Sequence, residues 1–383
     1  LQYRPSDATE ITFNALSSTM EMDNENQNFL WLAGYGGSEY TDITIIEHNQ
    51  VGAMAVGGTF GLSPDGNNIL DETKVRNSKL ETSSYDLKVD HEGDVWTSSI
   101  HFGYTEGSGG SEADRSVGWG GNYVHSYDAS DARDVKTSYG ADPADGSKWG
   151  LDFLRYDSND AQDDESYVQV DFGRDIDLGV FSAIKFGAKY RDHSRFNTKH
   201  TTDAREDLNW SLADYSLAMP SDFLSGQGSA GTLKDYAITD SNKIRNEGDA
   251  LGWDYRLLKA STFDISEKIS AAYIKADIDA EGLRGNVGVR LVYTDQSSAA
   301  YVGATGSEAW TDESTSYFDI LPSLNLAVDL QEDLLLRMSA ARVMSRPDYA
   351  KMTSSTSYNK ETQTGTGGNP DIDPYRATQF DLG

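Results

Sequence analysis

The sequence has no cysteine and only six histidines among its 383 residues. Disulfides are therefore impossible, and thiol chemistry and cysteine-based zinc sites are excluded with them. The six histidines form no HExxH pair, and no GxSxG elbow, dinucleotide fingerprint or phosphate loop is complete. Because no catalytic constellation is visible, we expect a protein that is not an enzyme.

Basic residues are scarce as well. Lys and Arg number 32 against 62 Asp and Glu, which gives a formal net charge of −30. A nucleic-acid binder needs a net basic face to displace counterions from phosphates, so nucleic acid is not an expected partner. The chain is nonetheless too rich in aromatic residues, with 21 Tyr, 13 Phe and 7 Trp, to be a disordered acidic segment.

Long apolar runs are also missing. The longest stretch without Asp, Glu, Lys or Arg covers residues 48–64 and contains four glycines. A membrane-spanning helix needs about 20 mainly apolar residues, so we expect none here.

Alternation of apolar and polar residues is the main pattern that is present. Such a period of two is typical of strands with one apolar and one polar face. It predicts strands of about ten to twelve residues, the length of a tilted transmembrane strand. The segments are 96–104, 180–190, 283–294, 318–330 and 334–340.

Short polar turns alternate with long connections along the chain. The turns lie at 90–94, 174–177, 279–282 and 331–333, and the long connections at 105–166, 192–261, 295–315 and 345–375. The glycine patch 107–110 is interpreted as a flexible turn inside the first long connection. Turns on one side and long loops on the other favour an antiparallel outer-membrane β-barrel, of which about ten or more strands are present. A soluble, secreted, acidic β-rich binding or surface protein is the alternative.

The strand faces give the first candidate site residues. Val289, Leu291 and Leu326 are predicted to face lipid. The opposite, polar faces are predicted to face the lumen, through Arg284, Asn286, Arg290 and Arg337. These residues would contact a plug, water or solute, and simple solvation of a wet interior explains them equally well.

The long connections give the second set. Residues 105–166 carry 14 acidic and 5 basic residues with aromatic rings between them. Rings beside carboxylates suit sugars, although for any single ring the preferred interpretation is that it holds a long loop together or belongs to an aromatic girdle at the membrane interface. The candidate substrate-binding residues are Trp119, Tyr123, Tyr127, Trp149, Trp210 and Trp310. The acidic run 157–165 (DSNDAQDDE) offers oxygens for calcium but departs from the EF-hand spacing, so a solvated acidic loop is the preferred interpretation.

Four ordered segments in the C-terminal third resemble a known family. They are EGLRGNVGVR (281–290), FDILPSLNL (318–326), AARVMSRPDY (340–349) and GNPDIDPYRA (368–377). They resemble barrel segments of TonB-dependent outer-membrane receptors, in the proteobacterial branch associated with carbohydrate uptake.

The resemblance implies a barrel of about 22 strands around a plug, in the outer membrane of a Gram-negative cell with its loops outside. It also implies capture of an oligosaccharide and import driven by the TonB–ExbB–ExbD complex acting through the plug, with no cofactor. A siderophore receptor of the same fold is the alternative. No signal peptide, TonB box, plug or final aromatic-terminated strand is recognised, so we expect residues 1–383 to be part of a longer receptor's barrel.

Overall fold

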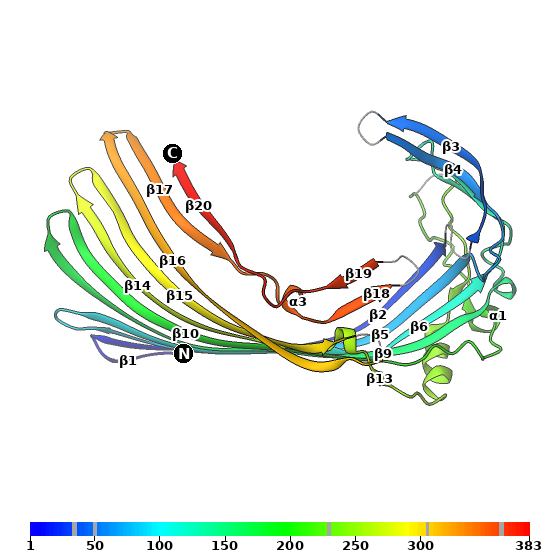
Figure 1. The fold of residues 1–383 in the computed structure, drawn as a ribbon, viewed down its shortest axis with the longest axis horizontal. Coiled ribbons are helices and arrows are strands. Elements are labelled where there is room, and N and C mark those ends of the chain that lie inside the picture. The colour runs from blue at the N-terminus through cyan, green and yellow to red at the C-terminus, as the bar shows by residue number, and fades with distance from the viewer. Residues whose placement is uncertain (33–36, 49–51, 228–230, 304–305, 360–363) are drawn as a thin grey trace.

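One large antiparallel sheet forms the body of the protein (Figure 1). The computed structural model describes residues 1–32, 37–48, 52–227, 231–303, 306–359 and 364–383. Neighbouring strands follow one another in the sheet in the order β1 (Gln2–Ser6), β2 (Thr9–Trp31), β5 (Ile69–Glu92), β6 (Thr97–Gly121), β9 (Gly150–Leu178), β10 (Phe181–Thr201), β14 (Phe263–Ala280), β15 (Leu283–Val302), β16 (Ala309–Gln331), β17 (Leu334–Ser345) and β20 (Tyr375–Leu382). A short strand, β13 (Arg256–Leu257), pairs with β10.

The antiparallel fold and the predicted strands are confirmed, but their predicted lengths are wrong. The strands from β5 to β10 have 21 to 29 residues, about twice the expected length. They continue deep into the connections predicted at 105–166 and 192–261, and the glycine patch 107–110 lies inside β6 rather than in a turn. The alternation fades there because both faces of the sheet become polar.

The register shows a continuous apolar band on one face. Directly opposed residues of neighbouring strands share a face. One row across the sheet consists of Phe13, Leu87, Phe102, Val168, Tyr190, Ser270, Tyr293 and Phe318. The next row consists of Ile11, Val89, Ile100, Val170, Ala188, Ala272, Leu291 and Ile320.

The band ends at Tyr85 and Tyr104, which oppose each other on β5 and β6. Beyond this pair, toward the start of β5 and the end of β6, polar residues replace the apolar ones. The next row on this face contains Ser83, Glu106 and Asp164. A tyrosine-edged apolar band is the pattern that a lipid-facing barrel surface shows.

The opposite face is the concave one. A connection after β17, here called the strap (residues 346–359 and 364–374), carries α3 (Tyr349–Met352), β18 (Thr356–Asn359) and β19 (Thr364–Gly367). Figure 1 shows these elements inside the curve of the sheet. Because Arg346 contacts Glu267, the row of Glu267 lies on the concave face.

A lobe made by residues 202–227 and 231–255 packs on the convex face at the far end of β5, β6 and β9. It contains α1 (Leu212–Tyr215), β11 (Ser216–Leu217), β12 (Ile238–Thr239), α2 (Ser241–Lys243) and η3 (Ile244–Gly248). Leu212 and Ile244 are fully buried against the strand residues Ile69, Val117 and Leu154. We call this element the outer lobe.

A second small sheet lies beyond the same end of the main sheet. Its strands are β3 (Tyr40–His48), β4 (Gly52–Phe60), β7 (His125–Asp128) and β8 (Lys136–Tyr139). Tyr40 stacks on Phe60 with ring centroids 4.4 Å apart. Single-turn helices η2 (Gly146–Lys148) and η4 (Lys259–Ser261) complete the described connections. Among the residues that the structure describes, no helix combines the length and apolarity needed to cross a bilayer.

Candidate functional site

The four residues predicted to face the lumen share the concave face. Arg284 and Arg337 both oppose Ala327, and Asn325 donates a 3.1 Å hydrogen bond to Asn286 beside them. Arg290 lies on the same side of β15 as Gln296, which donates a hydrogen bond to Pro370 of the strap. These positions are those expected for lumen-facing residues, and their contact with a solute stays a prediction.

The strap is held on the concave face by a ring stack. Tyr349 of α3 stacks on His193 of β10, with centroids 4.5 Å apart and planes inclined by 20°. The Tyr349 hydroxyl lies 3.3 Å from Nη2 of Arg191 and 3.5 Å from Oε2 of Glu267. His193 in turn lies 2.8 Å from Asp163. One tyrosine therefore connects the strap to β10 and β14 directly, and to β9 through His193.

Two buried carboxylates on the same face are each paired with an arginine. Glu267, whose side chain is 1% exposed, lies 3.2 Å from Nε of Arg346, and Arg346 also donates to Thr294. Asp319 is buried in the same way against Arg376 of β20. Removing one partner of such a pair leaves an uncompensated charge, so the pairs hold the ends of the strap in place.

A hollow of about 620 Å³ lies in the concave wall over β5, β6, β9 and β10, and we call it the wall hollow. Its floor is β6 at Gly107, where the space above the backbone is open, and at Gly109, over which the Leu80 side chain lies. Four acidic and three basic residues line it. On the concave face the charges are paired, Arg76 with Asp114, Arg195 with Asp163 and Lys199 with Asp157, whereas the fourth acid, Glu81, has its side chain on the convex face and pairs with Lys79. Lysine and arginine charges are thus balanced by carboxylates.

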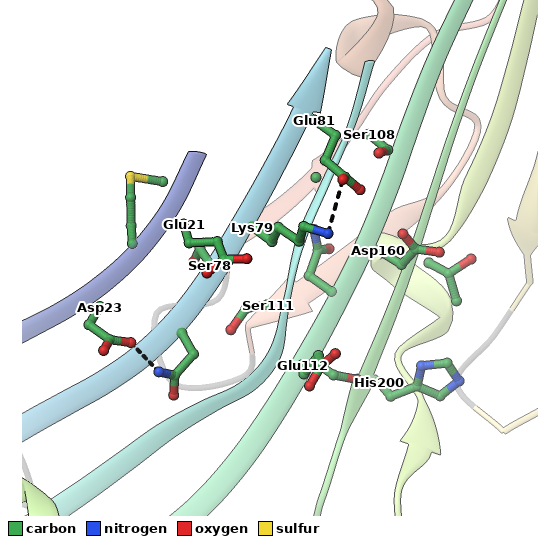
Figure 2. A pocket seen from close by; sticks show the side chains of 17 residues that line it. Glu21, Asp23, Ser78, Lys79, Glu81, Ser108, Ser111, Glu112, Asp160 and His200 are labelled. Atoms are coloured by element: carbon green, nitrogen blue, oxygen red, sulfur yellow. Dashed lines mark hydrogen bonds and ion pairs between the residues drawn. The ribbon is translucent and has the colours of Figure 1, made fainter. Parts of the chain in front are cut away.

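A larger hollow of about 830 Å³ lies on the convex face, and we call it the outer hollow. Figure 2 shows Glu21, Glu81, Glu112 and Asp160 reaching it from β2, β5, β6 and β9, with Lys79 paired to Glu81. It lies between the apolar band and the outer lobe, outside the enclosed side of the sheet. A solute crossing the barrel interior would therefore not meet it.

Two of the predicted substrate-binding rings are core residues. Trp119 lies in β6 and Trp149 follows η2, and both are 0% exposed. Trp119 donates a 2.9 Å hydrogen bond to Thr239, and Phe29 meets Trp149 edge-on at 5.6 Å. These rings have no exposed surface on which a sugar could stack, and they fix the outer lobe to the sheet. The predicted loop placement is wrong for Trp119, which lies in a strand, whereas Trp149 does lie in a connection, between η2 and β9.

The other four predicted rings keep some exposed surface but do not converge. Tyr123 and Trp210 pack against the core of the outer lobe. Tyr127 lies in β7 with its hydroxyl 2.9 Å from that of Tyr40. Trp310 lies in β16 rather than a loop, is 47% exposed and meets Tyr301 edge-on. A sugar-binding role for these four stays a prediction.

The acidic run 157–165 is also a strand rather than a loop, because it lies within β9. Its carboxylates alternate between faces, with Asp157 and Asp163 on the concave side and Asp160 and Asp164 on the convex side. They therefore do not converge on one ion. Within the described ranges, no group of three or more His, Asp or Glu side chains is placed to hold a metal.

Sequence reasoning missed Ser111, Asp114, His193 and Glu267 as site residues. Each is a single polar residue in a polar stretch, so nothing in the local pattern distinguishes it. Tyr349 had a signal, since it ends the AARVMSRPDY segment.

No curated protein matches the sequence. Among solved structures, the ferric citrate transporter FecA has a TM-score of 0.36 and 11% identity over 99% of this chain and 49% of its own. The siderophore receptor PiuA from Acinetobacter baumannii has a TM-score of 0.36 and 11% identity, over 98% and 52%. The ferric-catecholate import receptor Fiu from K12 E. coli gives 0.35 and 11%, over 100% and 56%. The chain spans about half the length of these proteins, and the likeness is too low to transfer a substrate.

A family model covers most of the chain. The model described as "TonB dependent receptor-like, beta-barrel" matches residues 75–383. The family consists of transport receptors, and its barrels lie in the outer membrane of Gram-negative bacteria. The match includes the strands that carry the apolar band from β6 onward and the whole strap. The chain belongs to the TonB-dependent receptor β-barrel family.

Proposed function

We propose that this chain is part of an outer-membrane receptor that captures a nutrient outside the cell and imports it actively. The observation that carries the proposal is the two-faced sheet. One face carries the apolar band edged by Tyr85 and Tyr104, and the other carries paired charges from end to end. Such a sheet suits lipid on one side and an aqueous interior on the other.

The proposed orientation places the short turns in the periplasm and the long connections outside. A short turn, residues 93–96, joins β5 to β6 at one end of the sheet, and the connection between β15 and β16, residues 303–308, lies at the other end. The turn 93–96 lies at the end of the sheet that carries the apolar band and would be periplasmic. The connection 303–308 lies at the end where both faces are polar and would be outside the cell. The outer lobe and the small sheet β3-β4-β7-β8 would then face the medium. Energy would reach the receptor from the TonB–ExbB–ExbD complex through a plug domain.

The proposed solute is an oligosaccharide. The chain carries a net charge of −30, which opposes the approach of an anionic iron chelate but is indifferent to a neutral sugar. Partly exposed rings at Trp210, Tyr123, Tyr127 and Trp310 would offer stacking surfaces. A siderophore receptor of the same fold is the competing function that the experiment must separate.

Deletion of the gene tests the proposal. Uptake of labelled neutral oligosaccharides and of ferric siderophores would be measured in deleted and complemented cells, with and without a proton uncoupler. We expect energy-dependent uptake of one oligosaccharide class to fall at least tenfold on deletion and to return on complementation. Unchanged uptake of every oligosaccharide, with loss of a ferric chelate instead, would refute the sugar assignment.

A further inference from the structure

We propose that the wall hollow is the site at which the receptor binds a neutral polyhydroxylated solute, one or a few sugar units in size. The proposal rests on the proposed function and adds to it the place of binding and the chemistry of recognition.

The first argument is the shape of the hollow. It has about 620 Å³ of space, enough for a small sugar, and its floor is the backbone of β6. At Gly107 an added Cβ would meet a single atom within 4 Å, the Asp163 carbonyl oxygen at 3.8 Å. The glycine therefore leaves open space above the sheet that an ordinary side chain would fill.

The second argument is an unused hydroxyl. Ser111 is 8% exposed and lines the hollow, yet its Oγ has no hydrogen-bond partner among the described residues. A buried polar group without a partner is costly and rare in a folded protein. Ser111 opposes Ser78 and Asn159, so its side chain lies on the concave face with the rest of the lining.

The third argument is an unused carboxylate oxygen nearby on the same strand. Arg76 donates to Oδ2 of Asp114 from Nε at 2.9 Å and from Nη2 at 2.6 Å. Oδ1 of Asp114 is buried and has no partner in the described part of the chain. A hydroxyl that can donate or accept and a carboxylate oxygen that can only accept suit neighbouring hydroxyl groups of a sugar.

The charges around the hollow decide the solute class. Arg195 lies 3.7 Å from Asp163 and Lys199 lies 3.9 Å from Asp157, so both cations keep donors free for a ligand. On the concave face three carboxylates balance the three cations, and Glu81 adds a fourth carboxylate to the lining, so the hollow has no excess positive charge that would attract an anion. A neutral ligand that both donates and accepts hydrogen bonds matches this lining better than an anionic iron chelate.

Filling the hollow tests the proposal. Gly107→Phe would place a ring over the floor on the concave face, whereas Ser108→Phe would place the same ring on the convex face as a matched control. The full-length receptor would be purified in detergent. Calorimetry would measure binding of maltotetraose, cellotetraose, xylotetraose and chitotetraose, with ferric citrate and a ferric catecholate as anionic probes. Thermal unfolding and detergent-resistant folding would be checked for each variant.

We expect the wild type to bind one tetrasaccharide, Gly107→Phe to raise its Kd at least tenfold, and Ser108→Phe to change it less than twofold. Asp114→Asn would weaken binding severalfold without loss of folding. Unchanged sugar affinity in folded Gly107→Phe would overturn the site while leaving the proposed function intact. Loss of ferric chelate binding in that variant would overturn the solute class. If the wild type binds none of the four sugars, the site is overturned, and the deletion experiment decides separately on sugar import.

Discussion

Arg115 of β6 and Asp249, the residue after η3, form a two-bond ion pair between the main sheet and the outer lobe. Nε donates to Oδ1 at 2.8 Å and Nη2 donates to Oδ2 at 2.7 Å. Tyr156 of β9 donates to the same carboxylate at 2.7 Å. Two strands and the lobe therefore meet at one aspartate.

Asp249→Ala should loosen the outer lobe, because it leaves the mostly buried Arg115 without its anion. Since the Asp249 side chain is 46% exposed, the cost is about 1–3 kcal/mol, below that of a fully buried pair. Faster hydrogen exchange at the backbone amides of Ile238 and Thr239, which form β12 of the outer lobe, would report this loosening. Asp207→Ala is the control, since the Arg205–Asp207 pair has similar geometry but lies in solvent. Equal amide protection in Asp249→Ala and Asp207→Ala would contradict the role of the Arg115–Asp249 pair in holding the outer lobe to the sheet.

The outer lobe should also respond to pH through Asp71. This residue lies near the start of β5, outside the apolar band, and among the described residues neither of its buried oxygens has a partner. Burial raises the pKa of the Asp71 carboxyl from 3.8 to about 7. The folded state therefore holds a proton that the unfolded state releases, and stability falls as the pH rises from about 4 to about 7.

The measurement is the protection of lobe amides, corrected for intrinsic exchange, at pH 5 and pH 8. Wild-type protection should be lower at pH 8, and Asp71→Asn should remove most of the difference. An identical pH dependence in wild type and Asp71→Asn would show that another group is responsible.

The strap should open when its ring stack is removed. Tyr349→Ala loses the contact with His193, and an aromatic pair contributes about 0.5–1.5 kcal/mol beyond its buried area. Tryptic cleavage after Lys351 should therefore become several times faster. Tyr375→Ala, at an exposed ring just after the strap, is the control. Equal cleavage rates in the two variants would mean that the stack does not hold the strap.

The two faces of β15 should tolerate charge differently. Leu291→Arg places a charge in the apolar band and should cost about 2–4 kcal/mol of folding free energy in a bilayer. Asn286→Arg places the same charge on the concave face and should cost much less. Urea unfolding in lipid vesicles would compare them, and similar losses would argue against a lipid-facing band.

The sequence predicted the membrane part of the fold well, because there one face must be apolar and the other polar. Two adjacent residues of β15 illustrate this rule, since Leu291 lies in the apolar band and Arg290 lies on the polar, concave face. It failed above the band, where Glu81, Glu106 and Asp164 occupy the convex face and the strands look like loops. How far the strands extend beyond the membrane is set by their pairing with neighbouring strands, which the local pattern of residues does not reveal.

The site was less predictable for a related reason. Trp119 and Trp149 looked like loop rings because nothing local shows that the outer lobe, more than 50 residues away along the chain from either ring, covers both of them. Arg76, Asp114 and Asp157 come together only through the register of three strands. The glycine patch 107–110 looked like a turn, although the missing side chain at Gly107 is what leaves the floor of the wall hollow open.

The most direct test of the two-faced sheet uses the absence of cysteine from residues 1–383. Single cysteines at positions 286 to 293 of β15, in the full receptor in membranes, would carry a fluorophore exposed to a lipid-soluble quencher. We predict strong quenching at 287, 289, 291 and 293 and weak quenching at the even positions. Equal quenching along the strand, or the reversed pattern, would contradict a barrel wall with lipid on its convex face and solute on its concave face.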